Sequence, residues 1–336
     1  MAIVNTLCIF ATPPWICCFL CNYNRTSNYL KIGDYCDVMA IEVVLKDMGE
    51  LLEGPHWDDV TNTLIYVDIT KKLIHSYNPV TKEAKKVVVH SEIGAAVPTS
   101  SGRTLASVGR EVGYVDWETG KFETFCEVDI KKSARFNDCK CDPSGRFWVG
   151  SMDKKSFAGC AEEYKGQGSL YCVHPDKTVR ECVQNVDISN GMAWASDHKT
   201  MYYIDSLTYG VDAFDYNNET GEIANRRQVI GFPKGGSFPD GMCIDDEGML
   251  WIAMFGGWSV HRFNPRTGEK LYTIKFPTKN ITSCCWGGAN RDELYVACAK
   301  VYLTEEELKE QETAGSVFRV TGLGVKGVKC DVFSEN

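Results

Sequence analysis

The chain has 336 residues, of which 44% are hydrophobic and 24% are charged, and its formal net charge is −9. This composition is typical of a globular protein. The acidic net charge and the lack of a basic cluster argue against nucleic-acid binding, because such a surface repels a phosphate backbone.

Residues 1–38 differ in character from the rest of the chain. The apolar stretch at residues 9–20 is interrupted by Pro13 and Pro14 and is too short to span a bilayer. It also lacks the basic residues and the clear cleavage pattern of a signal peptide. We therefore expect no membrane span, and a poorly ordered extension (1–38) followed by a single domain (39–336).

The sixteen cysteines form neither a metal-binding nor a disulfide pattern. Most stand alone in predicted strands, where a thiol acts as a small buried hydrophobe. The pairs Cys18/Cys21 and Cys139/Cys141 have no second pair or nearby histidine, as a zinc site would require. We therefore expect reduced thiols and a cytoplasmic protein.

A four-strand unit is clearest at residues 237–275. Apolar runs occupy residues 242–244, 249–254, 260–263 and 271–275, and polar or glycine-containing turns separate them. Similar units begin near residues 53, 96, 137, 190 and 282. A four-strand unit repeated every 40–50 residues or so indicates a β-propeller blade. The sequence therefore predicts an all-β fold, a six-bladed β-propeller of four-stranded blades, preceded by a short N-terminal extension outside it.

One short helix is predicted near the end of the chain. Thr304 and Glu307 have the spacing of a capping box, in which each side chain hydrogen-bonds the backbone of the other residue. We expect a short solvent-exposed helix in a loop of the last blade. Its acidic residues have this structural explanation and suggest no site.

Oxygen-bearing side chains begin four of the repeated units: Glu53, Asn137, Asn190 and Asp240. In a propeller the innermost strands line a central channel, and we expect residues just before those strands to converge at its mouth. A role in a turn explains each residue alone equally well, but convergence from four blades favours a shared site. Carboxylate and amide oxygens suit Ca²⁺, Mg²⁺ or Mn²⁺, and Zn²⁺ is less natural without histidine.

From about Glu53 to Lys329 the chain resembles the regucalcin family, also called the senescence marker protein 30 or gluconolactonase family. The resemblance depends on the order and spacing of several stretches, which run through all six predicted blades. They are EGPHW at 53–57, RFND at 135–138, DPSGR at 142–146, VDISNG at 186–191, YIDS at 203–206, VDAFDY at 211–216, PDGMCID at 239–245 and TGLGVKG at 321–327.

The resemblance implies one divalent metal ion at the mouth of the channel. It assigns three ligands to that ion: Glu53, Asn190 and Asp240. It also implies that Arg135 and Asn137 contact the substrate and that Asp138 lies near the same pocket. Members of the family hydrolyse sugar lactones such as gluconolactone, and animal members are also described as calcium-binding regulators.

A hydrolytic mechanism follows as a hypothesis. The metal ion (Ca²⁺, Zn²⁺, Mn²⁺ or Mg²⁺) would act as a Lewis acid on the lactone carbonyl and on a water molecule. Asp240 would take a proton from that water as general base, while Arg135 and Asn137 would hold the sugar hydroxyls. The predicted function is metal-dependent hydrolysis of sugar lactones by a monomer.

One departure from the family pattern bears on the substrate. A further glutamate that contacts substrate in the family would align within residues 151–155, where this chain has Lys154 and Lys155. A reversed charge favours a different lactone, ester or nitrile-like substrate, although Asp153 could replace the glutamate or Lys155 could point into solvent. The other alternative is a non-enzymatic calcium-binding regulator, against which the lack of an EF-hand loop argues.

Overall fold

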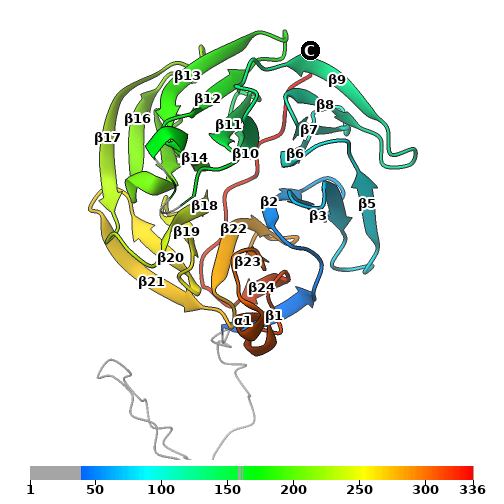
Figure 1. The fold of residues 1–336 in the computed structure, drawn as a ribbon, viewed down its shortest axis with the longest axis vertical. Coiled ribbons are helices and arrows are strands. Elements are labelled where there is room, and N and C mark those ends of the chain that lie inside the picture. Colours follow the sequence, from blue (N-terminus) through cyan, green and yellow to red (C-terminus); the bar gives the residue numbers. More distant parts are fainter. Residues whose placement is uncertain (1–38, 158–159, 161, 336) are drawn as a thin grey trace, which may run out of the picture. The chain divides into compact units, whose positions relative to one another are not determined.

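Six four-stranded antiparallel sheets stand in a ring in the computed structural model, which describes residues 39–157, 160 and 162–335 (Figure 1). The predicted fold class, an all-β six-bladed propeller, is therefore confirmed. Predictions for residues 1–38, including the extension and the Cys18/Cys21 pair, lie outside the described residues. The domain boundary at residue 39 stays a prediction.

Blades 1 to 3 follow one another along the chain, and the strands of each blade run in order from the innermost outward. Blade 1 contains β2 (Leu52–Asp58), β3 (Thr63–Asp68), β4 (Leu73–Tyr77) and β5 (Ala84–Val88). Blade 2 contains β6 (Ile93–Pro98), β7 (Thr104–Val108), β8 (Glu111–Val115) and β9 (Phe122–Glu127). Blade 3 contains β10 (Ala134–Cys141), β11 (Phe147–Asp153), β12 (Gly168–Val173) and β13 (Val179–Val186).

Blades 4 and 5 repeat this order, and blade 6 closes the ring. Blade 4 contains β14 (Ser189–Trp194), β15 (Thr200–Asp205), β16 (Gly210–Tyr216) and β17 (Ile223–Gly231). Blade 5 contains β18 (Phe238–Ile244), β19 (Leu250–Phe255), β20 (Ser259–Asn264) and β21 (Glu269–Lys275). Blade 6 contains β22 (Asn280–Gly287), β23 (Glu293–Ala299), β24 (Val317–Thr321) and β1 (Ala40–Leu45). The described helices are η1 (Glu162–Tyr164), η2 (Ser206–Thr208) and α1 (Glu305–Glu310).

The outermost strand of blade 6 comes from the opposite end of the described chain. β1 pairs antiparallel with β24, so that the first and last strands complete one sheet. The repeat pattern did not reveal this closure, because residues 40–45 precede the first unit. The pairing covers an edge of β24 that would otherwise expose unpaired backbone groups.

The core lies between the blades. Six apolar clusters among the described residues correspond to the six interfaces between neighbouring blades. Inner strands such as β19 are buried along almost their whole length, whereas the outermost strand β21 is mostly exposed. Burial on both faces explains why the inner strands read as continuous apolar runs rather than alternating ones.

All six innermost strands have an irregularity in their pairing with the second strand. In the four that carry the predicted site residues, the register shifts between Glu53 and His56, Phe136 and Cys139, Ser189 and Met192, and Pro239 and Met242. The site residues were predicted just before the innermost strands but lie within them. The reason is that each strand begins upstream of its bulge, and a bulge re-aims the side chains that it contains.

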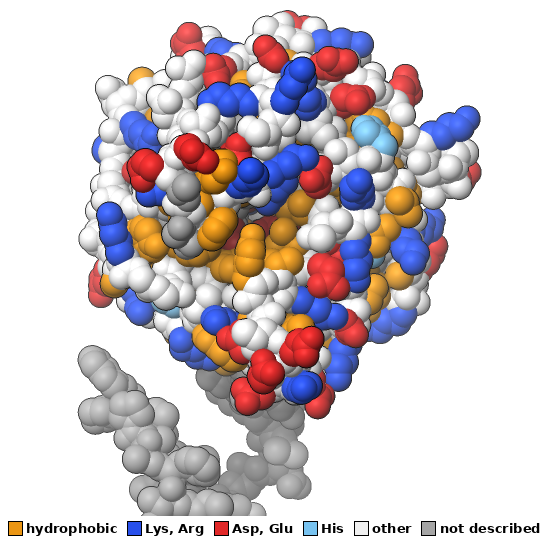
Figure 2. Space-filling model, in the orientation of Figure 1, with side chains coloured by type: hydrophobic (Ala, Val, Ile, Leu, Met, Phe, Trp, Pro, Cys, Tyr) orange, Lys and Arg blue, Asp and Glu red, His pale blue; other side chains and the backbone are white. Residues whose placement is uncertain are grey.

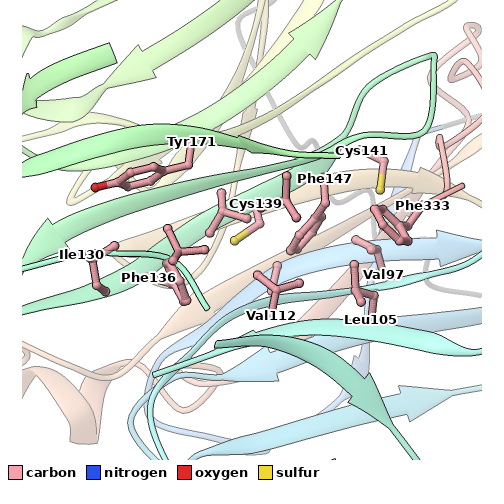
Figure 3. Close-up of a cluster of buried hydrophobic side chains, with 14 of the residues drawn as sticks. Val97, Leu105, Val112, Ile130, Phe136, Cys139, Cys141, Phe147, Tyr171 and Phe333 are labelled. Carbon is pink, nitrogen blue, oxygen red and sulfur yellow. The ribbon is translucent and has the colours of Figure 1, made fainter. Parts of the chain in front are cut away.

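The C-terminal segment crosses the ring after β24 (Figure 1). The turn after β18 in blade 5 donates a backbone hydrogen bond to Lys326 O, and farther along Phe333 pairs with Thr99 next to blade 2. The Phe333 ring is fully buried between blades 2 and 3, where it lies near Val97 and Leu105 (Figure 3). The end of the described chain thus links blades that are distant in sequence.

The predicted capping box is confirmed. Thr304 Oγ1 accepts a hydrogen bond from Glu307 N (3.2 Å), and Glu307 Oε2 accepts one from Thr304 N (2.9 Å), at the start of α1. None of the described helices has the length and apolarity that a membrane crossing requires. The eleven cysteines among the described residues are free thiols, and the cytoplasmic location stays a prediction.

Replacement of Phe333 by alanine should destabilise the propeller. Because the ring is fully buried in a packed interface, Phe333→Ala is expected to lower the free energy of unfolding by about 3–5 kcal/mol. Denaturant unfolding would measure this change. Val80→Ala is the control, since Val80 is 82% exposed and should change stability by less than about 0.5 kcal/mol. Equal effects of the two substitutions would contradict a structural role for the C-terminal segment.

Candidate functional site

A cavity opens at the end of the channel where the innermost strands begin. Four buried side chains from four different blades line it: Glu53 of β2, Asn137 of β10, Asn190 of β14 and Asp240 of β18. Arg135 of β10 lies beside them in the same cavity. The structure therefore brings five of the six predicted site residues together, and their individual roles stay predictions.

Asp138, the sixth predicted residue, does not line this cavity. Its carboxylate is buried, and its Oδ1 accepts a hydrogen bond from Cys139 N (2.8 Å). Burial raises the pKa of Asp138, and its negative charge contributes to the raised pKa values of Glu53 and Asp240. Its location favours an electrostatic effect on the cavity over contact with a substrate.

Buried negative charge dominates the cavity. Burial, with a further contribution from Asp138, raises the pKa of Glu53 to about 8. Burial and the nearby charge of Glu53 raise the pKa of Asp240 well above its ordinary value, and Arg135 opposes both shifts. Carboxylates buried in this way need either a proton or a bound cation, because an uncompensated buried charge is costly.

The donor atoms in the cavity fit a divalent cation. Glu53 and Asp240 supply carboxylate oxygens, and Asn190 supplies an amide oxygen. Within the described residues, His, Cys, Asp and Glu side chains form no group of three that could hold a metal ion by themselves. A metal site here would therefore need the Asn190 amide as a ligand. An all-oxygen set with one neutral ligand suits hard cations such as Ca²⁺, Mg²⁺ and Mn²⁺.

A directed chain of hydrogen bonds orients the two amides. Arg135 Nη1 donates to Asn137 Oδ1 (2.7 Å), and Asn137 Nδ2 donates to Asn190 Oδ1 (3.1 Å). Asn190 Nδ2 then donates to Ser206 Oγ (2.8 Å), which donates to Pro239 O (2.7 Å). A guanidinium can only donate, so the direction of every later hydrogen bond is fixed. Asn190 Oδ1 consequently keeps a second lone pair for a cation.

Ser206 and its neighbour Asp205 position blade 4, and sequence reasoning missed both. Ser206 Oγ connects the Asn190 amide to blade 5, and the Asp205 carboxylate accepts a hydrogen bond from Ile188 N (3.0 Å) just before β14. Both residues lie in the stretch YIDS at 203–206, which carried the family resemblance. Its spacing gave no sign that a hydroxyl would bridge two blades.

Lys154 and Lys155 lie outside the cavity. Lys154 Nζ pairs with Glu92 Oε2 (3.1 Å), and Lys155 Nζ lies 5.0 Å from the centroid of the Tyr164 ring. Asp153, which could have replaced the family's glutamate, is buried and accepts a hydrogen bond from Lys155 N (2.8 Å) without lining the cavity. The two lysines therefore bring no positive charge into the site.

Aromatic side chains form the outer part of the cavity wall. This aromatic rim consists of Phe157, Phe238, Phe255 and Tyr302, all of which line the cavity. Figure 2 shows apolar side chains gathered around a hollow near the centre of one face of the ring. Sequence reasoning missed the rim because its members come from loops and strand ends of three blades and share no spacing.

Comparison with known proteins identifies the family. Residues 51–300 match the family model described as the SMP-30/gluconolactonase/LRE-like region. The chain belongs to this family. Human regucalcin is 43% identical over 291 residues, which make up 86% of this chain and 97% of that protein. The predicted resemblance is confirmed, and family membership supports a lactonase-type function.

Solved structures share the fold. A luciferin-regenerating enzyme matches with a TM-score of 0.81 and 35% identity, covering 88% of this chain and 100% of that chain. Regucalcin from Agrobacterium tumefaciens, described as a calcium-binding protein, matches with a TM-score of 0.81 and 23% identity, covering 88% and 97%. At that lower identity the second match shows the fold alone.

Loss of the Ser206 hydroxyl should destabilise the site. Ser206→Ala leaves the buried Asn190 amide and Pro239 carbonyl without their partner, so the free energy of unfolding should fall by about 1–3 kcal/mol. Thermal and denaturant unfolding would measure the difference. Ser196→Ala makes the same chemical change at an exposed position and should stay within about 0.5 kcal/mol of the original protein. Equal stability of the two variants would show that the hydrogen bonds of Ser206 do not contribute to the free energy of unfolding.

Proposed function

We propose that this protein is a divalent-metal-dependent lactonase whose metal ion is held by Glu53, Asn190 and Asp240. The observation that supports this most strongly is the convergence of two buried carboxylates and an oriented amide beside a guanidinium in one cavity. Three protein ligands leave coordination positions open for water and substrate, which is typical of catalytic rather than structural metal sites.

The proposed reaction adds water across the ester bond of the lactone. When bound, a divalent cation supplies Lewis acidity, which draws electron density from the carbonyl group and makes a nearby water more acidic. Asp240 accepts a proton from the attacking water as its oxygen bonds to the carbonyl carbon. The ring C–O bond then breaks, and Asp240 returns the proton to the departing ring oxygen. The product is an open-chain hydroxy acid.

Arg135 is the residue best placed to hold a substrate oxygen. Within the described residues, the Arg135 guanidinium makes two hydrogen bonds to protein acceptors, and both come from Nη1. The acceptors are Phe136 O (2.8 Å) and Asn137 Oδ1 (2.7 Å). The remaining N–H groups of the guanidinium can therefore bind a carbonyl or carboxylate oxygen in the cavity. Such a contact would orient the ester beside Asp240 and stabilise negative charge as it develops.

Asn137 has less capacity for a substrate than the sequence suggested. Its Oδ1 accepts from Arg135, and its Nδ2 donates to both Ser189 O (2.8 Å) and Asn190 Oδ1 (3.1 Å). We therefore assign Asn137 the role of positioning Arg135 and Asn190. The predicted substrate contact would have to use the second lone pair of its Oδ1.

Sugar lactones are the first substrates to assay, because the family description includes gluconolactonases. A calcium-binding regulatory protein is the second candidate, since the same oxygen ligands would hold Ca²⁺ without turnover. The choice among Ca²⁺, Zn²⁺, Mn²⁺ and Mg²⁺, the small-molecule partner and the monomeric state all belong to this proposal.

Asp240→Ala should abolish both metal binding and catalysis. Because Asp240 is assigned as ligand and as general base, kcat for glucono-δ-lactone should fall by about 10²–10⁴-fold. The assay uses metal-stripped protein with each divalent cation added back, and calorimetry measures cation binding directly.

Asp215→Ala is the matched control, because it removes a carboxylate from an exposed position on β16. It should leave both cation binding and turnover unchanged. Near-normal turnover by Asp240→Ala would contradict the assignment, whereas cation binding without turnover by the original protein would favour the regulatory candidate.

A further inference from the structure

The aromatic rim forms a continuous apolar surface at the mouth of the cavity. The rings of Phe238 and Phe255 stack with their centroids 5.3 Å apart, and Phe255 meets Tyr302 edge to face at 6.2 Å. Tyr302 in turn stacks on Phe157 at 6.5 Å. The line connects residues of blades 5, 6 and 3, all of which line the cavity that also contains Glu53 and Asp240.

Two members of this rim expose large rings to solvent. Phe157 is 46% exposed and Tyr302 is 75% exposed, although both line the cavity. Exposed apolar surface that is contiguous and borders a pocket is typical of a ligand-binding site. These rings therefore offer hydrophobic contact to whatever enters the cavity.

Tyr302 holds this position in an unfavourable backbone conformation. Its φ is 63°, in the left-handed region that glycine and asparagine adopt far more readily than bulky residues. Eleven other described non-glycine residues, Tyr209 among them, also have positive φ, so this conformation alone does not mark a functional site. It does mean that glycine fits at residue 302 without backbone strain.

The amides and the serine hydroxyl of the cavity have little hydrogen-bonding capacity left for a polyhydroxylated ring. The amides of Asn137 and Asn190 are committed to the hydrogen-bond chain, and Ser156 Oγ donates to Asp187 O (3.0 Å). The N–H groups of Arg135 on Nη2 and Nε have no protein acceptor among the described residues and remain available. They can hold one ester group, whereas each further hydroxyl brought into the cavity would need its own partner.

We propose that the aromatic rim selects lactones that carry an alkyl or aryl substituent on the ring. The ester group lies at Asp240 and Arg135, and the substituent lies against Tyr302 and Phe157. This inference rests on the proposed lactonase function and specifies its substrate class. The inference also agrees with the departure from the family pattern at residues 151–155. There the cavity wall contributes the apolar side chain of Met152 in place of the family's glutamate.

The test compares δ-decalactone with δ-valerolactone, which differ only in a pentyl substituent, and includes glucono-δ-lactone. With the metal-loaded protein, kcat/KM for δ-decalactone should exceed that for each of the other two by at least about tenfold, the discrimination that an apolar pocket gives. Tyr302→Gly should reduce the ratio between the first two substrates by about the same factor. Because glycine relieves the strain at φ 63°, this variant should remain folded.

Tyr209→Gly is the matched control. It makes the same substitution at a φ of 56°, but Tyr209 does not line the cavity, so the ratio should equal that of the original protein. A preference for glucono-δ-lactone, or an unchanged ratio in Tyr302→Gly, would overturn the inference and leave the lactonase proposal standing.

If the protein hydrolyses none of the three lactones, the lactonase proposal is refuted instead. Calorimetry with the six-membered lactam that bears the same pentyl chain then decides the inference, since a lactam resists hydrolysis. No binding, or binding that Tyr302→Gly leaves unchanged, would overturn it.

Discussion

Close contact between the innermost strands of neighbouring blades is the constraint on which the site depends. A Cβ atom at Gly191 would lie 2.7 Å from Met242 N in the next blade, and one at Gly241 would lie 2.1 Å from Ser283 Oγ. Any side chain at these bulges would force the blades apart. Each glycine directly follows a proposed metal ligand, Asn190 or Asp240, so the contacts that close the ring also bring the ligands together.

Buried negative charge is the main electrostatic feature of the site. The propeller buries Glu53, Asp138 and Asp240 near one another, and burial raises the pKa of each carboxyl group. Arg135 compensates only part of this charge, which favours a divalent cation. The hydrogen bonds that begin at Arg135 also fix which atom of Asn190 is free to bind a proposed cation. Charge and amide orientation therefore depend on the same guanidinium.

The sequence was sufficient to predict the architecture because each blade repeats a local pattern of strands and turns. It also predicted that Glu53, Asn137, Asn190 and Asp240, which begin four of the repeats, converge, and they do line one cavity, although their functional roles stay predictions. Non-repetitive features were missed: the β1–β24 closure, the C-terminal segment, the Ser206 bridge and the aromatic rim. These features depend on residues that are far apart in sequence and meet only after folding, so no periodic pattern records them.

The most direct test of this account is a crystal structure of the protein grown with Mn²⁺, with anomalous diffraction used to locate the cation. The account predicts a peak within coordination distance of oxygen atoms from Glu53, Asn190 and Asp240. It also predicts that Asn190 Nδ2 still donates to Ser206 Oγ. A peak at another position, or no peak at a saturating Mn²⁺ concentration, would contradict the assignment of this cavity as a metal centre.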